Sequence, residues 1–454
     1  MSKVVLAPPK TDDIVTSHTA TWSDEKKAEF ASYIETQKLD YEPTVSAGDH
    51  VIVKTRKSSS FFTIRSGANQ KLKVKNIAAP LDRIIEQPYH AAFNQEGKRK
   101  RQSIFSDEGL FEHLDNINND EGFIPTANNA ELFDNNENQT LTQADILKMK
   151  EEGKSSDEII KAVALSSKTF LTKTEYSQKK WLRKKLAKHS HDFTLYRPTI
   201  ASILATITER EPRKALHMRD DTMAQLLQYA NVGANNNTLV VETASGLITG
   251  AVAQRQGGFG KVLSGHLSHQ PTINLIDEYN LTSAEKSSIT PFPLGILSGV
   301  SKLKAQGKDT DAILQHFHAQ YMANKQAAIA AKGNTVDPAD ISLTLFQQQQ
   351  QDARAMLATG LDSLILATHY DPLSLLLALL PFLRPSSPIV VYCETIEPLS
   401  RAVHHLIANK LAANVQLSES WYRKYTIAPN ISHPEMSMPQ ASSGYILTGF
   451  TVAQ

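Results

Sequence analysis

The periodicity of hydrophobic and polar positions changes several times along this chain of 454 residues. Residues 1–44 are polar and weakly periodic, which is typical of a flexible tail. Three short runs at 50–54, 61–65 and 71–75 then alternate apolar residues with Lys, Arg or Thr, and Gly, Ser and Asn separate them. Such alternation is typical of half-buried strands. It predicts a small antiparallel β-barrel or sandwich over residues 45–94.

The next segment, 95–140, is rich in Asn, Asp and Glu and poor in β-branched residues, so we interpret it as an acidic linker. It contains the basic run Lys98, Arg99, Lys100 and Arg101. Such a run is often only solvated, but it can also contact phosphates or act as a nuclear localisation signal.

Helical patterns resume over 141–198 and include the most basic stretch of the protein, 177–189. Trp181, Leu182 and Leu186 can anchor one side of this helix. The remaining positions are Lys179, Lys180, Arg183, Lys184, Lys185 and Lys188. A solvated helix face is one interpretation, but so dense a run of one sign in a neutral protein favours RNA binding, with an affinity that falls steeply with salt.

From residue 199 to 454 helical and strand patterns alternate, which predicts a mainly parallel sheet with helices on both faces. The candidate strands are 238–241, 261–264, 363–367, 389–393, 422–427 and 445–450. The last two are close in sequence and are expected to form an antiparallel pair at one edge of the sheet. A polar helical insertion at about 301–351 suggests no function.

The segment 239–248 has the layout of the first strand, turn and helix of a nucleotide-binding α/β domain. Methyltransferases that use S-adenosylmethionine follow an acidic residue with Gly-x-Gly-x-Gly in this turn. Counted from Glu242, those glycines fall on Ala244, Gly246 and Ile248. A β-branched residue at 248 is expected to obstruct a loop that faces a ligand. We therefore predict a degenerate cofactor site, with an unrelated α/β domain as the alternative.

Composition narrows the choice of function class. The net charge of +1 gives no general attraction to nucleic acid, so any RNA binding must come from local clusters. Cys393 is the sole cysteine, which excludes an intrachain disulfide and a cysteine-cluster zinc site. The apolar run 373–383 is about half of the ~20 residues that a membrane span needs, so it predicts a buried helix. The N-terminus lacks a secretory signal pattern, and no membrane or metal is expected.

Three separated regions resemble one family, the non-catalytic subunit of the eukaryotic tRNA adenosine-58 N1-methyltransferase. They are 166–180; 219–222 with 231–232, 246–247 and 255–258; and 433–438 with 443–449. With the strand pattern near residue 50, the resemblance covers most of 45–454. It implies a C-terminal Rossmann-like methyltransferase fold.

The resemblance also implies which catalytic features are missing. His266 stands where the catalytic paralogue has an acidic residue for the cofactor ribose, and Ala367 stands where it has an aspartate near the target base. Asp371 is the nearest carboxylate, but its position suits a helix cap. The family therefore implies a chain that binds no cofactor, while its catalytic partner holds S-adenosylmethionine.

The implied assembly is a nuclear heterotetramer of two pairs, each a non-catalytic and a catalytic subunit, that methylates tRNA. The basic helix and residues 98–101 would form two tRNA contact strips. Two alternatives remain: a self-sufficient, divergent S-adenosylmethionine-dependent RNA methyltransferase, and a freestanding RNA-binding module.

Overall fold

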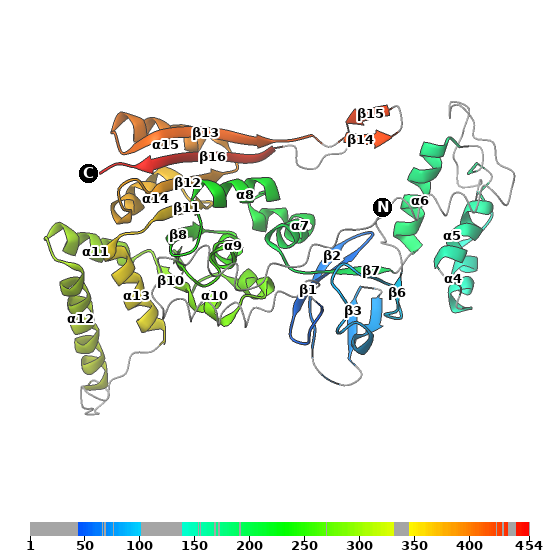
Figure 1. The fold of residues 1–454 in the computed structure, drawn as a ribbon, viewed down its shortest axis with the longest axis horizontal. Helices are drawn as coiled ribbons and strands as arrows, with labels where there is room; N and C mark the ends of the chain where they lie inside the picture. The colour runs from blue at the N-terminus through cyan, green and yellow to red at the C-terminus, as the bar shows by residue number, and fades with distance from the viewer. Residues whose placement is uncertain are drawn as a thin grey trace, which may run out of the picture.

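The computed structural model shows an N-terminal β domain, a cluster of helices and a C-terminal α/β domain (Figure 1). It describes residues 44–100, 139–330 and 345–453, apart from short breaks at 66, 68–69, 76, 153, 155, 168, 171–172, 190–191, 269, 424, 429–430 and 435–441. Residues 1–43 of the predicted tail and residues 101–138 of the predicted linker lie outside the described residues.

The N-terminal domain is antiparallel, as predicted. Its five-stranded sheet has the order β2-β1-β7-β5-β6, and β3 pairs with β4 in a separate hairpin. The strands are β1 His50–Thr55, β2 Ser59–Thr63, β3 Lys71–Val74, β4 Ile77–Pro80, β5 Ala92–Phe93, β6 Arg99–Lys100 and β7 Phe193–Tyr196, with the short helix η1 Leu81–Arg83 after β4. Side chains from both sheets share one core, in which Val51, Leu72, Phe93 and Phe193 are buried.

The structure moves two predicted domain boundaries. Strand β7 lies inside the region predicted as helical up to residue 198, yet it pairs with both β1 and β5 in the middle of the N-terminal sheet. Strand β6 lies inside the predicted linker and pairs with β5. Both strands are too short to give a periodic signal, and their pairing depends on partners far away in the sequence.

Within the described residues, three helices lie between β6 and β7: α4 Gln143–Glu151, α5 Ser156–Leu165 and α6 Glu175–His189. Helices α5 and α6 and the segment between them enclose a small core, made by Ile160, Ala164, Phe170, Leu182 and Leu186. The basic stretch is therefore helical, as predicted, and it is anchored through the two leucines. Figure 1 shows this cluster at the right of the molecule.

The C-terminal domain contains a seven-stranded sheet of order β10-β9-β8-β11-β12-β16-β13. The strands are β8 Asn237–Glu242, β9 Lys261–His266, β10 Ile289–Pro293, β11 Ser363–Ala367, β12 Pro388–Cys393, β13 Ala412–Trp421 and β16 Ser442–Thr451. The first five in the order are parallel, and β16 is antiparallel to both of its neighbours. The predicted parallel sheet with an antiparallel edge is confirmed.

The edge strand differs from the prediction. The partner of β16 is β13, at Ala412–Trp421, and not the run 422–427. Residues of that run instead contribute to β14 Tyr425–Ala428, which forms a hairpin with β15 Ile431–Pro434 beyond the end of the sheet (Figure 1). β13 was missed because it is an edge strand with mostly polar, exposed positions, so that its apolar signal is weak.

Helices cover both faces of this sheet, as alternate strand residues require. In β8, Val240 points into one core with α7, α8 and α9, while Leu239 and Val241 point into a second core with α11, α13, α14 and α15. The helices on the first side are α7 Ile200–Arg210, η3 Pro212–Ala215, α8 Asp220–Tyr229, α9 Leu247–Gln256, η4 Asn274–Tyr279 and α10 Ser283–Ser287. The others are α11 Ile296–Ala305, α12 Thr310–Ala330, α13 Leu345–Thr359, α14 Pro372–Leu379, η6 Leu380–Phe382 and α15 Ile396–Ala408.

The described residues include no helix that is both long and apolar enough to span a bilayer. The apolar run at 373–383 forms α14 and η6, and Leu376, Leu379 and Phe382 are buried in the second core. The prediction that this apolar run, too short for a membrane span, forms a buried helix is therefore confirmed.

Several hydrogen bonds join the N-terminal sheet to the C-terminal domain, including one of 3.3 Å between the His50 ring and the Glu278 carboxylate. The Asn280 side chain accepts from the His50 amide and donates to the His50 carbonyl, both at 2.8 Å. The Glu209 carboxylate of α7 accepts from the amide and the hydroxyl of Ser59, at 3.1 and 2.8 Å. Ile52 of β1 also packs into the core of the C-terminal domain. The two domains are therefore held in one orientation.

Candidate functional site

The carboxylate that closes β8 is used by the chain itself. Glu242 accepts hydrogen bonds from the amides of Ile248 and Thr249, at 3.0 and 2.7 Å, and from the Thr249 hydroxyl at 2.5 Å. These groups belong to the first turn of α9, whose amides have no partner within the helix. Burial raises the pKa of Glu242, and these donors partly oppose that rise. The carboxylate therefore caps a helix.

The turn that follows is covered by another segment of the chain. Ala244 is fully buried, and Gly246 has a φ of +90°. A Cβ on Gly246 would lie 2.9 Å from the Cα of Ile273. The amide of Leu275 donates to the Ser245 carbonyl at 3.0 Å. The surviving glycine thus allows residues 273–275 to cross the turn closely.

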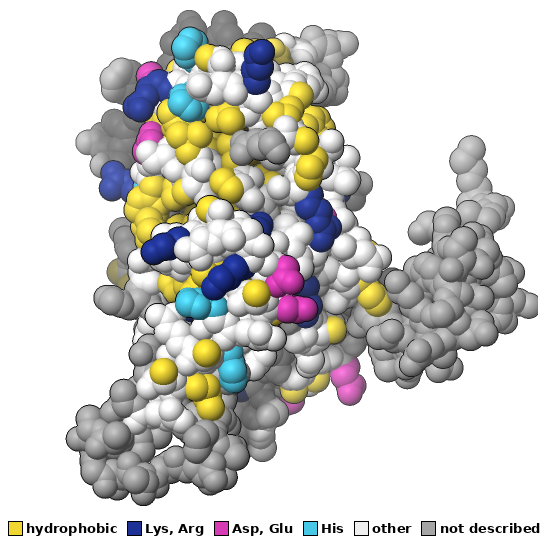
Figure 2. Space-filling view, turned by 90° about the vertical axis from the view of Figure 1, so that its left-hand side faces the viewer, with side chains coloured by type: hydrophobic (Ala, Val, Ile, Leu, Met, Phe, Trp, Pro, Cys, Tyr) yellow, Lys and Arg dark blue, Asp and Glu magenta, His cyan; other side chains and the backbone are white. Residues whose placement is uncertain are grey.

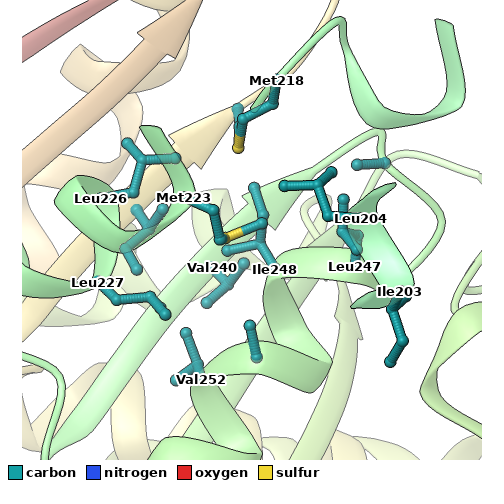
Figure 3. Packing of buried hydrophobic residues seen from close by; sticks show 14 of the residues in the cluster. Ile203, Leu204, Met218, Met223, Leu226, Leu227, Val240, Leu247, Ile248 and Val252 are labelled. Carbon is teal, nitrogen blue, oxygen red and sulfur yellow. The ribbon is translucent and has the colours of Figure 1, made fainter. Parts of the chain in front are cut away.

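Ile248 does not face a ligand position, and this part of the sequence prediction is wrong. Ile248 is the second residue of α9, and its side chain is fully buried in the core with Met223, Val240 and Leu247 (Figure 3). The sequence predicted a helix from Leu247, as the structure has it, but the glycine pattern led to the expectation that the side chain at 248 faces the ligand. A β-branched residue has no positive-φ penalty inside a helix.

Tyr279, at the end of η4, fills the space that remains beside α9. Its side chain is 1% exposed, and its hydroxyl donates to the Leu247 carbonyl at 2.6 Å. The ring lies so close to Gly250 that a Cβ there would be 2.6 Å from it. This plug was not predicted from the sequence. A glycine inside an otherwise apolar helix is the signal that could have indicated a close approach.

The two neighbouring strand ends lack the expected carboxylates. His266 ends β9, and its Nδ1 is 2.8 Å from the Ser268 carbonyl, within its own loop. Ala367 ends β11 and is fully buried. Its carbonyl accepts from the Thr243 amide at 3.1 Å, and the Thr243 hydroxyl accepts from the His369 amide at 3.2 Å. Thr243 thereby ties the two turns together.

Asp371 is a helix cap, as predicted. It is the N-cap of α14, and its carboxylate accepts from the amide and the hydroxyl of Ser374, at 3.0 and 2.6 Å. These bonds lower the pKa of Asp371. The carboxylate is thus already occupied in stabilising α14, and it is not placed as a base.

At the carboxyl edge of the sheet a crevice runs over the strand ends, and beyond the filled turn after β8 this crevice is open. A cavity of about 580 Å³ lies at the carboxyl ends of β11 and β12, a region that the sequence analysis did not identify. Its lining includes Arg213, His217, His369 and Arg401. Among the described residues, no cluster of three or more His, Cys, Asp or Glu side chains could hold a metal ion.

The basic helix α6 presents an exposed cationic face. Lys180, Arg183, Lys184 and Lys188 are exposed, whereas Leu182 and Leu186 are buried on the opposite side. Lys180, Lys184 and Lys188 are spaced four residues apart, so they form one stripe along the helix. The side chain of Lys179 lies outside the described residues.

Lys185 differs from these cations. It is half-buried, and its Nζ lies 5.1 Å from the centre of the Trp181 ring, a cation-π distance. Burial and the charge of Lys188 lower the pKa of Lys185. Lys185 therefore packs beside the stripe rather than within it.

The basic run at 98–101 is placed on the N-terminal sheet, in and next to β6. Lys98 pairs with Glu96 at 2.8 Å, and Lys100 pairs with Asp192 at 2.7 Å. Arg99 is exposed, and Arg101 lies outside the described residues. Two of these cations thus already have carboxylate partners, which leaves a weaker phosphate surface than the sequence suggested.

The strand order, with its antiparallel seventh strand, defines a Rossmann-like methyltransferase fold, in which the chain itself fills the turn after β8. Two solved methyltransferases are similar in structure to the chain. A SAM-dependent O-methyltransferase from Thermotoga maritima is 10% identical with a TM-score of 0.46, covering 90% of this chain and 96% of its own. The tRNA (m1A58) methyltransferase TrmI from Aquifex aeolicus is 12% identical with a TM-score of 0.40, covering 91% and 100%.

The chain belongs to the Gcd10p family, whose model matches residues 44–325. A relative from Dictyostelium discoideum is 30% identical over 90% of this chain and 80% of its own length. One from Mus musculus is 31% identical over 72% and 74%. Both are named as the non-catalytic subunit of tRNA (adenine(58)-N(1))-methyltransferase. The family resemblance seen in the sequence is confirmed.

Proposed function

We propose that this chain is the non-catalytic, tRNA-binding subunit of a tRNA adenine-58 N1-methyltransferase, and that a catalytic paralogue performs the methyl transfer. The observation that carries this proposal is the filled turn after β8. Residues 273–279 occupy the position over Gly246 and α9, and Glu242 is committed to capping that helix. The family relationship supports the same conclusion.

The chain is proposed to bind no S-adenosylmethionine. A cofactor in this fold needs space above the turn and a polar group at the end of the second strand for its ribose. Ile273 occupies the first position, and His266 bonds to its own loop at the second. A histidine ring lacks the two acceptor oxygens with which a carboxylate binds adjacent hydroxyls. The cofactor then belongs to the catalytic partner.

The tRNA contact is proposed to be the exposed face of α6, with a smaller contribution from residue 99 and its neighbours. A cationic stripe follows phosphates without reading bases, which suits recognition of a folded RNA by shape. Extrusion of a buried base costs a few kcal/mol, and a broad phosphate contact can offset that cost. A heterotetramer of two such pairs, located in the nucleus, completes the proposal.

The direct test is methyl transfer from labelled S-adenosylmethionine to unmodified tRNA. We would measure it with this chain alone, with the catalytic paralogue alone and with both. Activity in the mixture only is the expected result. Activity of this chain alone would support the self-sufficient enzyme instead. Tight tRNA binding without association with the paralogue would support a freestanding RNA-binding module.

The role of α6 is tested by reversing charges on its exposed stripe. The double variant Lys184→Glu and Lys188→Glu should lower tRNA affinity at least tenfold. It should also make the affinity less dependent on salt, because each phosphate contact to a duplex contributes about 0.9 to the slope of log affinity against log salt concentration. Lys185 is left unchanged because it packs on Trp181.

The control variant is Lys302→Glu with Lys308→Glu, two exposed lysines at and after the end of α11. This end of the molecule lies away from α6 (Figure 1), and Figure 2 shows scattered Lys and Arg side chains on it among hydrophobic ones, without a continuous basic stripe. Equal losses of affinity in both variants would mean that α6 is only a solvated face.

A further inference from the structure

The open part of the crevice has the composition of a binding site. In the same sheet where the turn after β8 is filled, the ends of β11 and β12 border a cavity of about 580 Å³. This volume lies within the roughly 300–1,000 Å³ range of small-molecule sites. We propose that this cavity binds one ribonucleotide unit, either a free ribonucleoside monophosphate or a nucleotide of an RNA strand.

Two arginines from different elements supply the phosphate contact. Arg213 belongs to η3 and Arg401 to α15, and both line the cavity. Both side chains are exposed, and the charge of Arg401 also acts on Asp371, whose pKa it helps to lower. Guanidinium groups bind phosphate oxygens through paired N–H donors. The two arginines can therefore offer donors to a phosphate in the cavity.

The other polar groups distinguish a nucleotide from a simple anion. Glu394 and Glu397 also line the cavity, and their carboxylates can accept hydrogen bonds from ribose hydroxyls. Asp371 is the third carboxylate of this lining, which has two arginines. An anion that offers only phosphate oxygens would therefore meet more negative than positive side chains. Tyr370, 45% exposed, offers a ring on which a base can stack.

The backbone beside these groups is held in an unfavourable conformation. Leu216 and His217 have φ values of 51° and 52°, so two consecutive non-glycine residues are left-handed. The left-handed conformation is unfavourable for residues with a Cβ, and strained positions cluster at functional sites. The buried hydroxyl of Tyr392 donates to the Leu216 carbonyl at 2.7 Å and fixes this corner. The corner places His217 in the cavity lining.

The N-terminus of α15 also borders the cavity. Its N-cap, Thr395, makes no side-chain capping bond, and Thr395, Glu397 and Pro398 line the cavity. The first amides of a helix lack partners within it and attract anions, but Pro398 has no N–H, so among the lining residues of this helix only Glu397 offers an amide. Groups from η3, β12, α15 and the turn before α14 thus converge on one opening.

The test is direct binding of AMP to the full chain, measured by calorimetry. We expect saturable one-to-one binding, with adenosine and inorganic phosphate at least tenfold weaker. Arg213→Gln and Arg401→Gln should each weaken AMP binding at least tenfold. Lys410→Gln, just after the opposite end of α15, is the matched control and should have no effect. His217→Asn tests the imidazole with a residue that tolerates left-handed backbone.

The source of the ribonucleotide follows from competition with unmodified tRNA. Displacement of a fluorescent AMP analogue by tRNA would assign the site to a nucleotide of the RNA, and retention of the analogue would assign it to a free nucleotide. The proposal is overturned if AMP does not bind, or if it binds both arginine variants as tightly as the parent chain. It is also overturned if these variants lose the catalytic partner instead, since the cavity would then be a protein contact.

This inference does not depend on the proposed function. AMP binding by the chain is measured without methyl transfer or a partner, so a failure in either assay leaves the other interpretable. The α6 variant with Lys184→Glu and Lys188→Glu provides the cross-check. It should lose tRNA affinity and keep AMP affinity, because α6 contributes no residue to the cavity.

Discussion

The two halves of the crevice at the carboxyl edge of the C-terminal sheet differ in what occupies them. Above β8, the chain fills the space with Ile273 and Tyr279 and caps α9 with Glu242. Above β11 and β12, a cavity of about 580 Å³ remains open, with arginines, histidines and carboxylates at its border. The difference teaches that packing can fill the space over one strand of a sheet while the space over the neighbouring strands stays accessible.

The filled half contributes to stability, and the open half contributes little. Tyr279 and Ile248 are buried and belong to the first core, so their removal would leave a cavity. Tyr370 and Arg401 of the open half are exposed, and substitutions at such positions usually change stability by less than about 0.5 kcal/mol. The change in unfolding free energy on substitution should therefore be large at Tyr279 in the filled half and small at Tyr370 in the open half.

The largest expected effect is at Tyr279. Replacing a buried aromatic residue by alanine typically costs about 3–5 kcal/mol, so Tyr279→Ala should lower the unfolding free energy by that amount in urea. Tyr279→Phe, which loses only the hydrogen bond to Leu247, should cost about 1 kcal/mol. Tyr370→Ala is the matched control in the open half. Equal costs at positions 279 and 370 would contradict the contrast between the halves.

A smaller loss is expected at Glu242. Glu242→Ala leaves two amides and a hydroxyl at the start of α9 without their acceptor. An unsatisfied buried donor costs about 1–3 kcal/mol, and urea unfolding at constant pH measures the loss. Asp371→Ala, which removes the cap of the exposed α14 terminus, is the comparison and should cost about 1 kcal/mol.

Glu242 should also make stability depend on pH. Because burial raises its pKa above the usual 4.5, the folded state binds this proton more tightly than the unfolded state. The resulting stabilisation is complete below the unfolded pKa and is lost as pH rises through the folded pKa. The stability of the parent relative to Glu242→Gln should therefore decline as the pH is raised from 4.5. An increase with pH would show that the hydrogen bonds outweigh desolvation.

The smallest effect is expected at His217, and it has the opposite sign. His217→Gly relieves a left-handed conformation that costs roughly 1–2 kcal/mol, while glycine adds about 0.5–1 kcal/mol of unfolded-state entropy. A gain of up to about 1 kcal/mol is expected by urea unfolding, together with weaker AMP binding. A loss of stability would mean that the imidazole supports the fold, and that the strain serves no ligand.

Much of the architecture could be predicted from periodicity. The strands near 238, 261, 363 and 389 and the basic helix near 180 all form. The predictions failed where pairing or packing depends on distant residues. Position 248 belongs to a helix core, because the turn ends at Gly246, two residues before the last position of the glycine pattern. Strand β13 is exposed and polar, so it carries little apolar signal.

By itself the sequence determined the family, the parallel sheet, the loss of two of the three turn glycines and the cationic stripe, because these depend on local composition and on order along the chain. Only the tertiary structure decided what fills the turn after β8 and what stays open beside it. Tyr279 meets Leu247 across 32 residues, and Tyr392 holds Leu216 across 176. Contacts of such separation leave no local pattern, because each side chain obtains its partner only after the sheet and its helices have packed.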